Sequence, residues 1–240
     1  IRSLMARIFV PLLDSADTYT HKTAVKFISS LSMLSGASVA EITEDGELSR
    51  MCGRGLIDFA GLSLWRQLGV LNAVGFAMRN GVSFEFPPGT DEQHALEMYI
   101  AQLSRICWES SDELLSRKTY MLVGISSPTI PHAATAATIR EASVRALCLA
   151  YVYLPGRDTI DGLRAERILR TVTDALRGRD PKEEGLRAAA VEGILEAYKL
   201  RPLPDEVIKA QLQKLVEAIE AIKELSNVNA RLFCLLIRLN

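Results

Sequence analysis

The stretch DPKEEGLRAAAVEGILEAY, residues 180–198, carries the strongest helix-start signal of the chain. Asp180 is a favourable N-cap, Pro181 suits the first helical position, and Glu183 completes a capping box. The apolar residues that follow are spaced as one buried helix face requires; they are Leu186, Ala189, Val191, Ile194, Leu195 and Tyr198. We therefore predict a helix from about residue 181.

Helix starts of this kind recur along the chain. Thr90–Gln93 and Ser110–Glu113 are also capping boxes. Weaker starts lie at Pro131–His132, Asp158–Thr159 and Asp205. Every second start recurs after about 41 to 49 residues, so the spacing predicts helices arranged in pairs. Glycine or proline marks the predicted stops at Gly81, Pro155–Gly156 and Gly178.

The first 80 residues predict less regular helices, at about 3–14, 20–34, 37–42, near Glu47 and 62–78. Pro11 should kink or end the first helix. Gly36 should close the second. The glycines Gly53, Gly55 and Gly61 should separate the short helix near Glu47 from the long apolar one, at a junction where glycine permits close approach. Strand alternation is weak, and its best case is 82–86.

Helix pairs of this length, with Asp180–Pro181 at a repeat turn, resemble HEAT and armadillo repeats. The partner helix lies within 205–225 and carries Val207, Ile208, Leu212, Leu215, Val216 and Ile219. The resemblance covers at most about residues 90–225 and implies an all-α fold of antiparallel helix pairs stacked as an α-solenoid. A non-repetitive helical bundle is the alternative. We expect an N-terminal helical region at 1–81 and a helical-repeat region at 90–240, or one continuous solenoid over 1–240.

Composition limits the functional classes. The chain has 240 residues, 48 % of them hydrophobic, and a formal net charge of −1. Such a chain can bury a core and is not a disordered polymer. The balanced charge argues against a dedicated nucleic-acid binder, because counterion release needs many Lys and Arg side chains on one surface.

No catalytic or ligand-binding motif is evident. His21, His94 and His132 lie far apart, and Gly53–Arg54–Gly55 is not a phosphate loop. We expect no catalytic residues, no metal site and no cofactor. The four cysteines form no C-x-x-C pair and predict buried thiols in a reducing compartment, hence an intracellular location, cytoplasmic or nuclear. Trp65 and Trp108 are expected in the core.

Arg164 and Arg167 are the candidate partner-binding residues. They lie three apart and so share one face of a predicted helix. Guanidinium groups suit acidic peptides or phosphates, although a solvated face with local ion pairs explains them as well.

Three functions remain open. The first is a non-catalytic scaffold or adaptor that acts through protein–protein binding, with an acidic partner as one option. The second is an all-helical protein that coats nucleic acid, with a hinge at Gly81–Gly89. The third is an all-helical enzyme or small-ligand regulator. We expect no membrane insertion, because no apolar run reaches about 18 residues. The start at Ile1 and the apolar stretch 232–237 predict a piece of a longer chain or complex.

Overall fold

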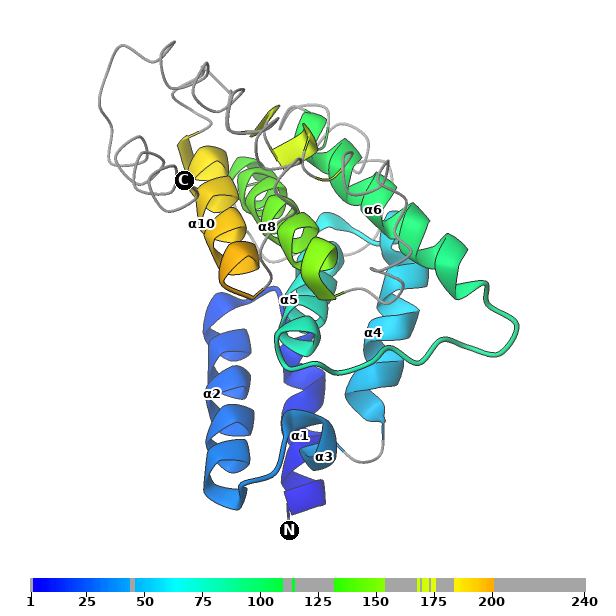
Figure 1. The fold of residues 1–240 in the computed structure, drawn as a ribbon, viewed down its shortest axis with the longest axis vertical. Coiled ribbons are helices and arrows are strands. Elements are labelled where there is room, and N and C mark those ends of the chain that lie inside the picture. Colours follow the sequence, from blue (N-terminus) through cyan, green and yellow to red (C-terminus); the bar gives the residue numbers. More distant parts are fainter. Residues whose placement is uncertain are drawn as a thin grey trace. The chain divides into compact units, whose positions relative to one another are not determined.

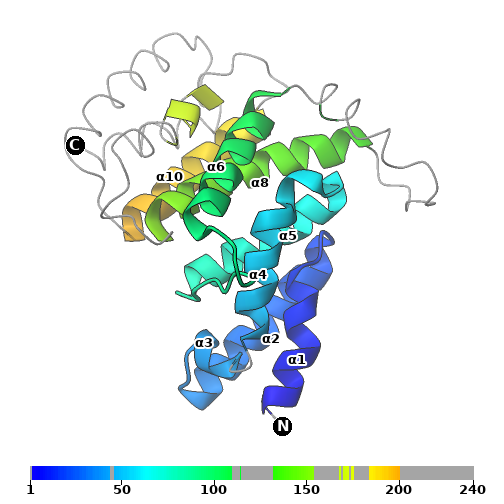
Figure 2. The same ribbon diagram turned by 90° about the vertical axis from the view of Figure 1, so that its right-hand side faces the viewer.

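The computed structural model describes residues 2–43, 46–109, 114, 132–153, 168, 170–172, 174–175 and 184–200. These residues form helices joined by turns and extended segments, and no strand occurs among them (Figures 1 and 2). The all-α prediction is therefore confirmed for this part of the chain. In the same residues, no helix combines the length and the hydropathy that a bilayer crossing demands.

The chain divides into two compact units. Unit 1 comprises Ile1–Gln102 and Ser111–Ile139, and unit 2 comprises Leu103–Ser110 and Arg140–Asn240. Helices α6 (Glu92–Trp108) and α8 (His132–Tyr153) each contribute residues to both units. The division into regions 1–81 and 90–240 stays a prediction.

Unit 1 begins with a pair of packed helices, α1 (Arg2–Leu13) and α2 (Thr18–Ser35), seen in blue in Figure 1. Asp17 caps α2 by accepting a hydrogen bond from the Thr20 backbone N–H at 2.7 Å. Gly36 ends α2 with φ +68°, a left-handed conformation that glycine adopts without strain. The predicted stop at Gly36 is confirmed. The short helix α3 (Val39–Ile42) follows and starts with a capping box between Ser38 and Glu41.

Pro11 neither ends α1 nor prevents its last turn. The predicted helix at about 3–14 is confirmed, and it continues past the proline to Leu13. Of the two expected effects of Pro11, ending the helix is therefore wrong, and a kink stays a prediction. Val10 and Leu13 on either side of the proline are fully buried. Burial of these apolar side chains stabilises the turn enough to offset the backbone hydrogen bond that proline cannot donate.

The glycines of α4 (Glu47–Asp58) lie inside the helix and do not separate two helices. The predicted separation is therefore wrong at Gly53 and Gly55, but Gly61 does lie between α4 and α5, and the predicted close approach is present. A Cβ at Gly53 would collide with the Glu85 backbone, and one at Gly55 would lie 2.9 Å from Val70. Glycine is needed here for packing rather than for a turn.

The 3-10 turn η1 (Phe59–Gly61) connects α4 to α5 (Leu64–Arg79). Helix α5 is buried over most of its length, as its apolar sequence predicts. It ends where Gly81 adopts φ +65°, and the Val82 N–H donates to Ala77 O while the Gly81 N–H donates to Met78 O. These two bonds form a Schellman motif, which confirms the predicted stop at Gly81.

Residues 82–87 are extended but belong to no sheet. The segment crosses α4, where the Glu85 N–H donates to Ser49 O and the Ser49 hydroxyl donates to Ser83 O. Helix α6 then begins close to the predicted place. Its cap is Asp91, which accepts from the His94 N–H at 3.1 Å, and not Thr90 as the capping box suggested. The aspartate one position later supplies the same bond.

In unit 2, helix α8 lies beside α10 (Glu184–Leu200). A Cβ at Gly185 would meet Glu141, and one at Gly193 would lie 2.8 Å from Cys148 Sγ. The contacts therefore advance in the same direction along both helices, which run parallel. Arg145 and Glu192 form an ion pair of 3.0 Å across the contact.

Several predicted elements fall outside the described residues. They are the start at 180–183, the starts at 110–113 and 158–159, the stops at Pro155–Gly156 and Gly178, and the amphipathic helix 205–225.

Gly69→Ala tests the contact between α1 and α5. Alanine favours an isolated helix by about 1 kcal/mol over glycine. A Cβ at Gly69 would nevertheless lie 2.7 Å from both the backbone O and Oδ1 of Asp14. We expect the variant to lose about 1–3 kcal/mol in the free energy of unfolding, measured by urea denaturation. Gly61→Ala is the control, because a Cβ there meets nothing within 4 Å. Equal stability of the two variants would contradict this packing.

Candidate functional site

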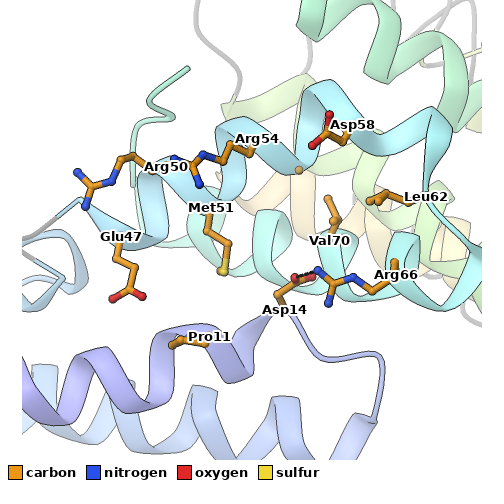
Figure 3. A pocket seen from close by; sticks show the side chains of 11 residues that line it. Pro11, Asp14, Glu47, Arg50, Met51, Arg54, Asp58, Leu62, Arg66 and Val70 are labelled. Carbon is orange, nitrogen blue, oxygen red and sulfur yellow. Dashed lines mark hydrogen bonds and ion pairs between the residues drawn. The ribbon is translucent and has the colours of Figure 1, made fainter. Parts of the chain in front are cut away.

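A polar pocket of about 360 Å³ lies in unit 1 between α1, α4 and α5 (Figure 3). Its lining includes three arginines, Arg50, Arg54 and Arg66. It also includes three carboxylates, Asp14, Glu47 and Asp58, so the formal charges of the lining cancel. A pocket without excess positive charge gives no electrostatic preference for an anionic ligand.

The centre of this pocket is an ion pair that joins two helices. Arg66 donates to Asp14 Oδ2 at 2.7 Å, shown by the dashed line in Figure 3. Six residues further along α5, the Asn72 amide donates to the Ser15 backbone O at 2.8 Å. Gly69 lies between these two residues and lets the end of α1 approach the helix backbone. The polar pocket is thus a joint between the end of α1 and α5.

Burial raises the pKa of Asp14 above its usual value of 3.8, and the Arg66 guanidinium opposes this shift without cancelling it. The Asp14 side chain is 12 % exposed, and its Oδ1 atom has no hydrogen-bond partner. The carboxylate therefore depends on Arg66 for most of its compensation.

A second, apolar pocket of about 250 Å³ lies in unit 1 between the end of α4, η1 and α6. Ile57, Ala60 and Met98 contribute apolar walls, and Asp91, His94 and Gln102 contribute polar groups. Ile57 is 40 % exposed and Met98 is 46 % exposed. Pockets for drug-sized ligands measure about 300–1,000 Å³, so this one is closer to the size of a single large side chain.

The floor of the apolar pocket is a pair of aromatic rings. Phe59 and Tyr99 meet edge to face with ring centroids 5.1 Å apart. Both side chains are almost fully buried, and within the described part of the chain the Tyr99 hydroxyl has no hydrogen-bond partner. Burial, with Cys52 nearby, raises the pKa of this hydroxyl far above its usual value. The floor is therefore rigid and uncharged.

The exposed side of α2 is the third surface of interest. Tyr19, Met33 and Leu34 are 79 %, 82 % and 86 % exposed, which makes them the most exposed large apolar side chains of the described residues. Lys22 and Lys26 lie on the same side of the helix, with Ser29 and Ser30 further along. We call these seven residues the outer face of α2. Helix α2 carries no Asp or Glu, so this face is cationic as well as apolar.

Arg164 and Arg167 lie outside the described residues, so their role as partner-binding residues stays a prediction.

His21 and His94 are not brought together: His21 Nδ1 lies 3.0 Å from Leu13 O, whereas His94 lines the apolar pocket. Burial lowers the pKa of His21. Among the described residues, no three His, Cys, Asp or Glu side chains are grouped as a metal site requires.

The described cysteines are buried free thiols, as predicted for Cys52, Cys107 and Cys148. Burial raises the pKa of Cys52 and of Cys107 to about 12. Thiols with such a pKa hold almost no thiolate at neutral pH and are poor nucleophiles. They serve packing in both units.

Trp108 is 59 % exposed, so its prediction as a core residue is wrong. It is the last residue of α6, whereas its neighbours Ile106 and Cys107 are buried. Trp65 is half-buried.

Comparison of the chain with protein-family models, with curated proteins and with solved structures gives no match.

Sequence reasoning missed the apolar pocket and the outer face of α2. One signal for the face was visible: 18 consecutive residues of α2 contain two lysines and no carboxylate. The pocket had no comparable signal, because Ile57 and Met98 are 41 positions apart and only the fold brings their helices together.

The raised pKa of Asp14 predicts a specific pH dependence. The folded state binds the Asp14 proton more tightly than the unfolded state, so Asp14 lowers stability as pH rises from about 3.8 through its folded pKa. Other carboxylates act in this range, so the informative quantity is the difference between wild type and Asp14→Asn. The stability of wild type minus that of the variant should fall with rising pH across this window. Urea unfolding from pH 3 to pH 7 measures it, and a rising difference would contradict the assignment.

Tyr99→Phe tests the floor of the apolar pocket. Removing a buried hydroxyl without a partner should leave the free energy of unfolding unchanged or raise it by up to about 1 kcal/mol. Thr43→Val is the control, since the buried Thr43 hydroxyl donates to Val39 O at 2.9 Å and its loss should cost about 1 kcal/mol. Thermal unfolding compares them, and a marked loss in Tyr99→Phe would show that the hydroxyl is bonded.

Proposed function

We propose that this chain is a non-catalytic, helical-repeat scaffold that acts through protein–protein binding. The observation that carries the proposal is the outer face of α2, where three large apolar side chains are more than three-quarters exposed. Met33 and Leu34 adjoin in the last turn of α2, and Tyr19 lies on the same side in the first turn, about 21 Å away along the axis. Exposed apolar side chains aligned on one side of a helix favour a partner that lies along it, whereas single scattered ones are common on any protein. Tyrosine is also enriched among residues that contribute most to binding.

The helix arrangement within each unit supports the repeat architecture. In unit 1, α1 packs against α2, and α4 packs against α5, each pair joined by a short connection. In unit 2, α8 and α10 run parallel, the relation that alternate helices have in a stack of antiparallel pairs. An α-solenoid is therefore our proposed architecture, with a non-repetitive bundle as its alternative.

The proposed partner is an acidic protein surface. Lys22 and Lys26 have no ion-pair partner among the described residues, so their charges are available to a carboxylate on another molecule. Arg164 and Arg167 remain proposed contributors to the same preference. We also propose an intracellular location, because the described cysteines are buried free thiols.

Photo-cross-linking in the cells that express the chain tests the proposal. A benzophenone amino acid replaces Met33 on the outer face of α2, and in the control it replaces Glu184, an exposed residue at the start of α10. We expect a discrete protein adduct from position 33, absent from position 184 and reduced by Lys22→Glu with Lys26→Glu. Adducts of equal yield at both positions, or adducts only to nucleic acid, would contradict the proposal.

A further inference from the structure

We propose that the outer face of α2 binds a second copy of this chain, with Tyr19 inserted into the apolar pocket of that copy. This inference rests on the proposed function and names the partner of the same face. The observations that carry it are a protruding aromatic side chain, a pocket of matching chemistry and two sets of opposite charges. All of them belong to unit 1.

The pocket suits both parts of a tyrosine side chain, the aromatic ring and the hydroxyl group. Its walls include Leu56, Ile57 and Met98, above the Phe59–Tyr99 floor. An aromatic ring between such walls gains burial and edge-to-face contacts. Asp91, His94 and Gln102 provide polar groups at the same pocket for the tyrosine hydroxyl. Tyr19 is 79 % exposed, so it does not fill the pocket of its own chain.

The charges around the pocket complement those around Tyr19. The first two turns of α6, residues 92–98, carry Glu92 and Glu97 and contain no Lys or Arg, and the cap Asp91 precedes them. All three carboxylates are on exposed residues. The outer face of α2 instead carries Lys22 and Lys26 and no carboxylate. Opposite charges on two surfaces raise the rate of encounter and select the register of docking.

The positions of the charges are compatible with a tyrosine seated between the glutamates. At 3.6 residues per turn, Lys22 and Lys26 lie about 40° apart around α2 and so face the same way. Glu92 and Glu97 lie about 140° apart around α6, on opposite sides of the pocket-lining residues His94 and Met98. With Tyr19 in the pocket, we therefore expect the lysines to approach the carboxylates that flank it rather than to form two matched pairs. Because the two surfaces differ, the contact is heterologous and either closes into a ring or extends as a chain of copies.

Charge exchange in the purified full chain tests this contact. Sedimentation velocity over micromolar to submillimolar concentrations should show association of wild type that weakens as salt is added. Lys22→Glu with Lys26→Glu should abolish it, and so should Glu92→Lys with Glu97→Lys. An equimolar mixture of the two double variants should associate again. This recovery shows that both variants are folded, so a folding defect cannot imitate the result.

Single-residue and charge-matched variants complete the test. Tyr19→Ala should weaken self-association by about 30-fold, the loss typical of an aromatic residue central to an interface. Arg54→Glu with Arg170→Glu changes the net charge as the lysine variant does, at exposed residues of other helices, and should associate as wild type does.

A monomeric wild type at every concentration, or a mixture that does not associate, overturns the inference. So does a Tyr19→Ala variant that associates like wild type. These outcomes are separate from failure of the proposed function. If position 33 still cross-links to a different protein, the outer face of α2 is a binding face and only its assignment to a second copy is wrong.

Discussion

The ion pair between Asp14 and Arg66 fixes where the first helix pair meets the rest of unit 1. Burying a carboxylate is costly, and a single guanidinium at 2.7 Å compensates only part of that cost here. The pair forms only because Gly69 has no side chain to hold α1 away from α5. Removing Arg66 would leave an uncompensated buried charge at the joint. Helix α1 also packs against α4, so the position of α2 and of its outer face depends on this contact together with that packing.

The sequence predicted the helix ends at Gly36 and Gly81 because these ends depend on local chemistry. Gly36 and Gly81 end helices in left-handed conformations, which glycine adopts without strain. The residue type alone therefore marks these ends. The apolar sequence 62–78 likewise predicted the buried helix α5, since a helix that is apolar on most sides has to be covered.

The errors occurred where distant parts of the chain meet. Gly53 resembles a helix breaker, yet it lies within α4 because the segment that carries Glu85 crosses the helix there. Pro11 remains helical because its neighbours are buried against other helices. Trp108 was assigned to the core by residue type, but its position at the end of α6 leaves it exposed. None of these contacts has a signal within a few residues of sequence.

The size and charge of each candidate surface limit the kind of partner that it can bind. The polar pocket has a balanced lining organised around a structural ion pair, and the apolar pocket has room for about one large side chain. The outer face of α2 and the apolar pocket instead combine exposed apolar area with opposite charges. This combination favours binding to another macromolecule. The charges of the outer face of α2 are opposite to those beside the apolar pocket.

Hydrogen–deuterium exchange on the intact chain tests most directly whether the joint holds α2 in place. The account predicts that backbone amides in the middle of α1 and α2 are protected as strongly as those of α5 in wild type. In Arg66→Ala, protection of α1 and α2 should fall while that of α5 falls less, because the first helix pair would open by itself. Fast exchange of α1 and α2 in the wild type, or equal protection in the variant, would contradict the account.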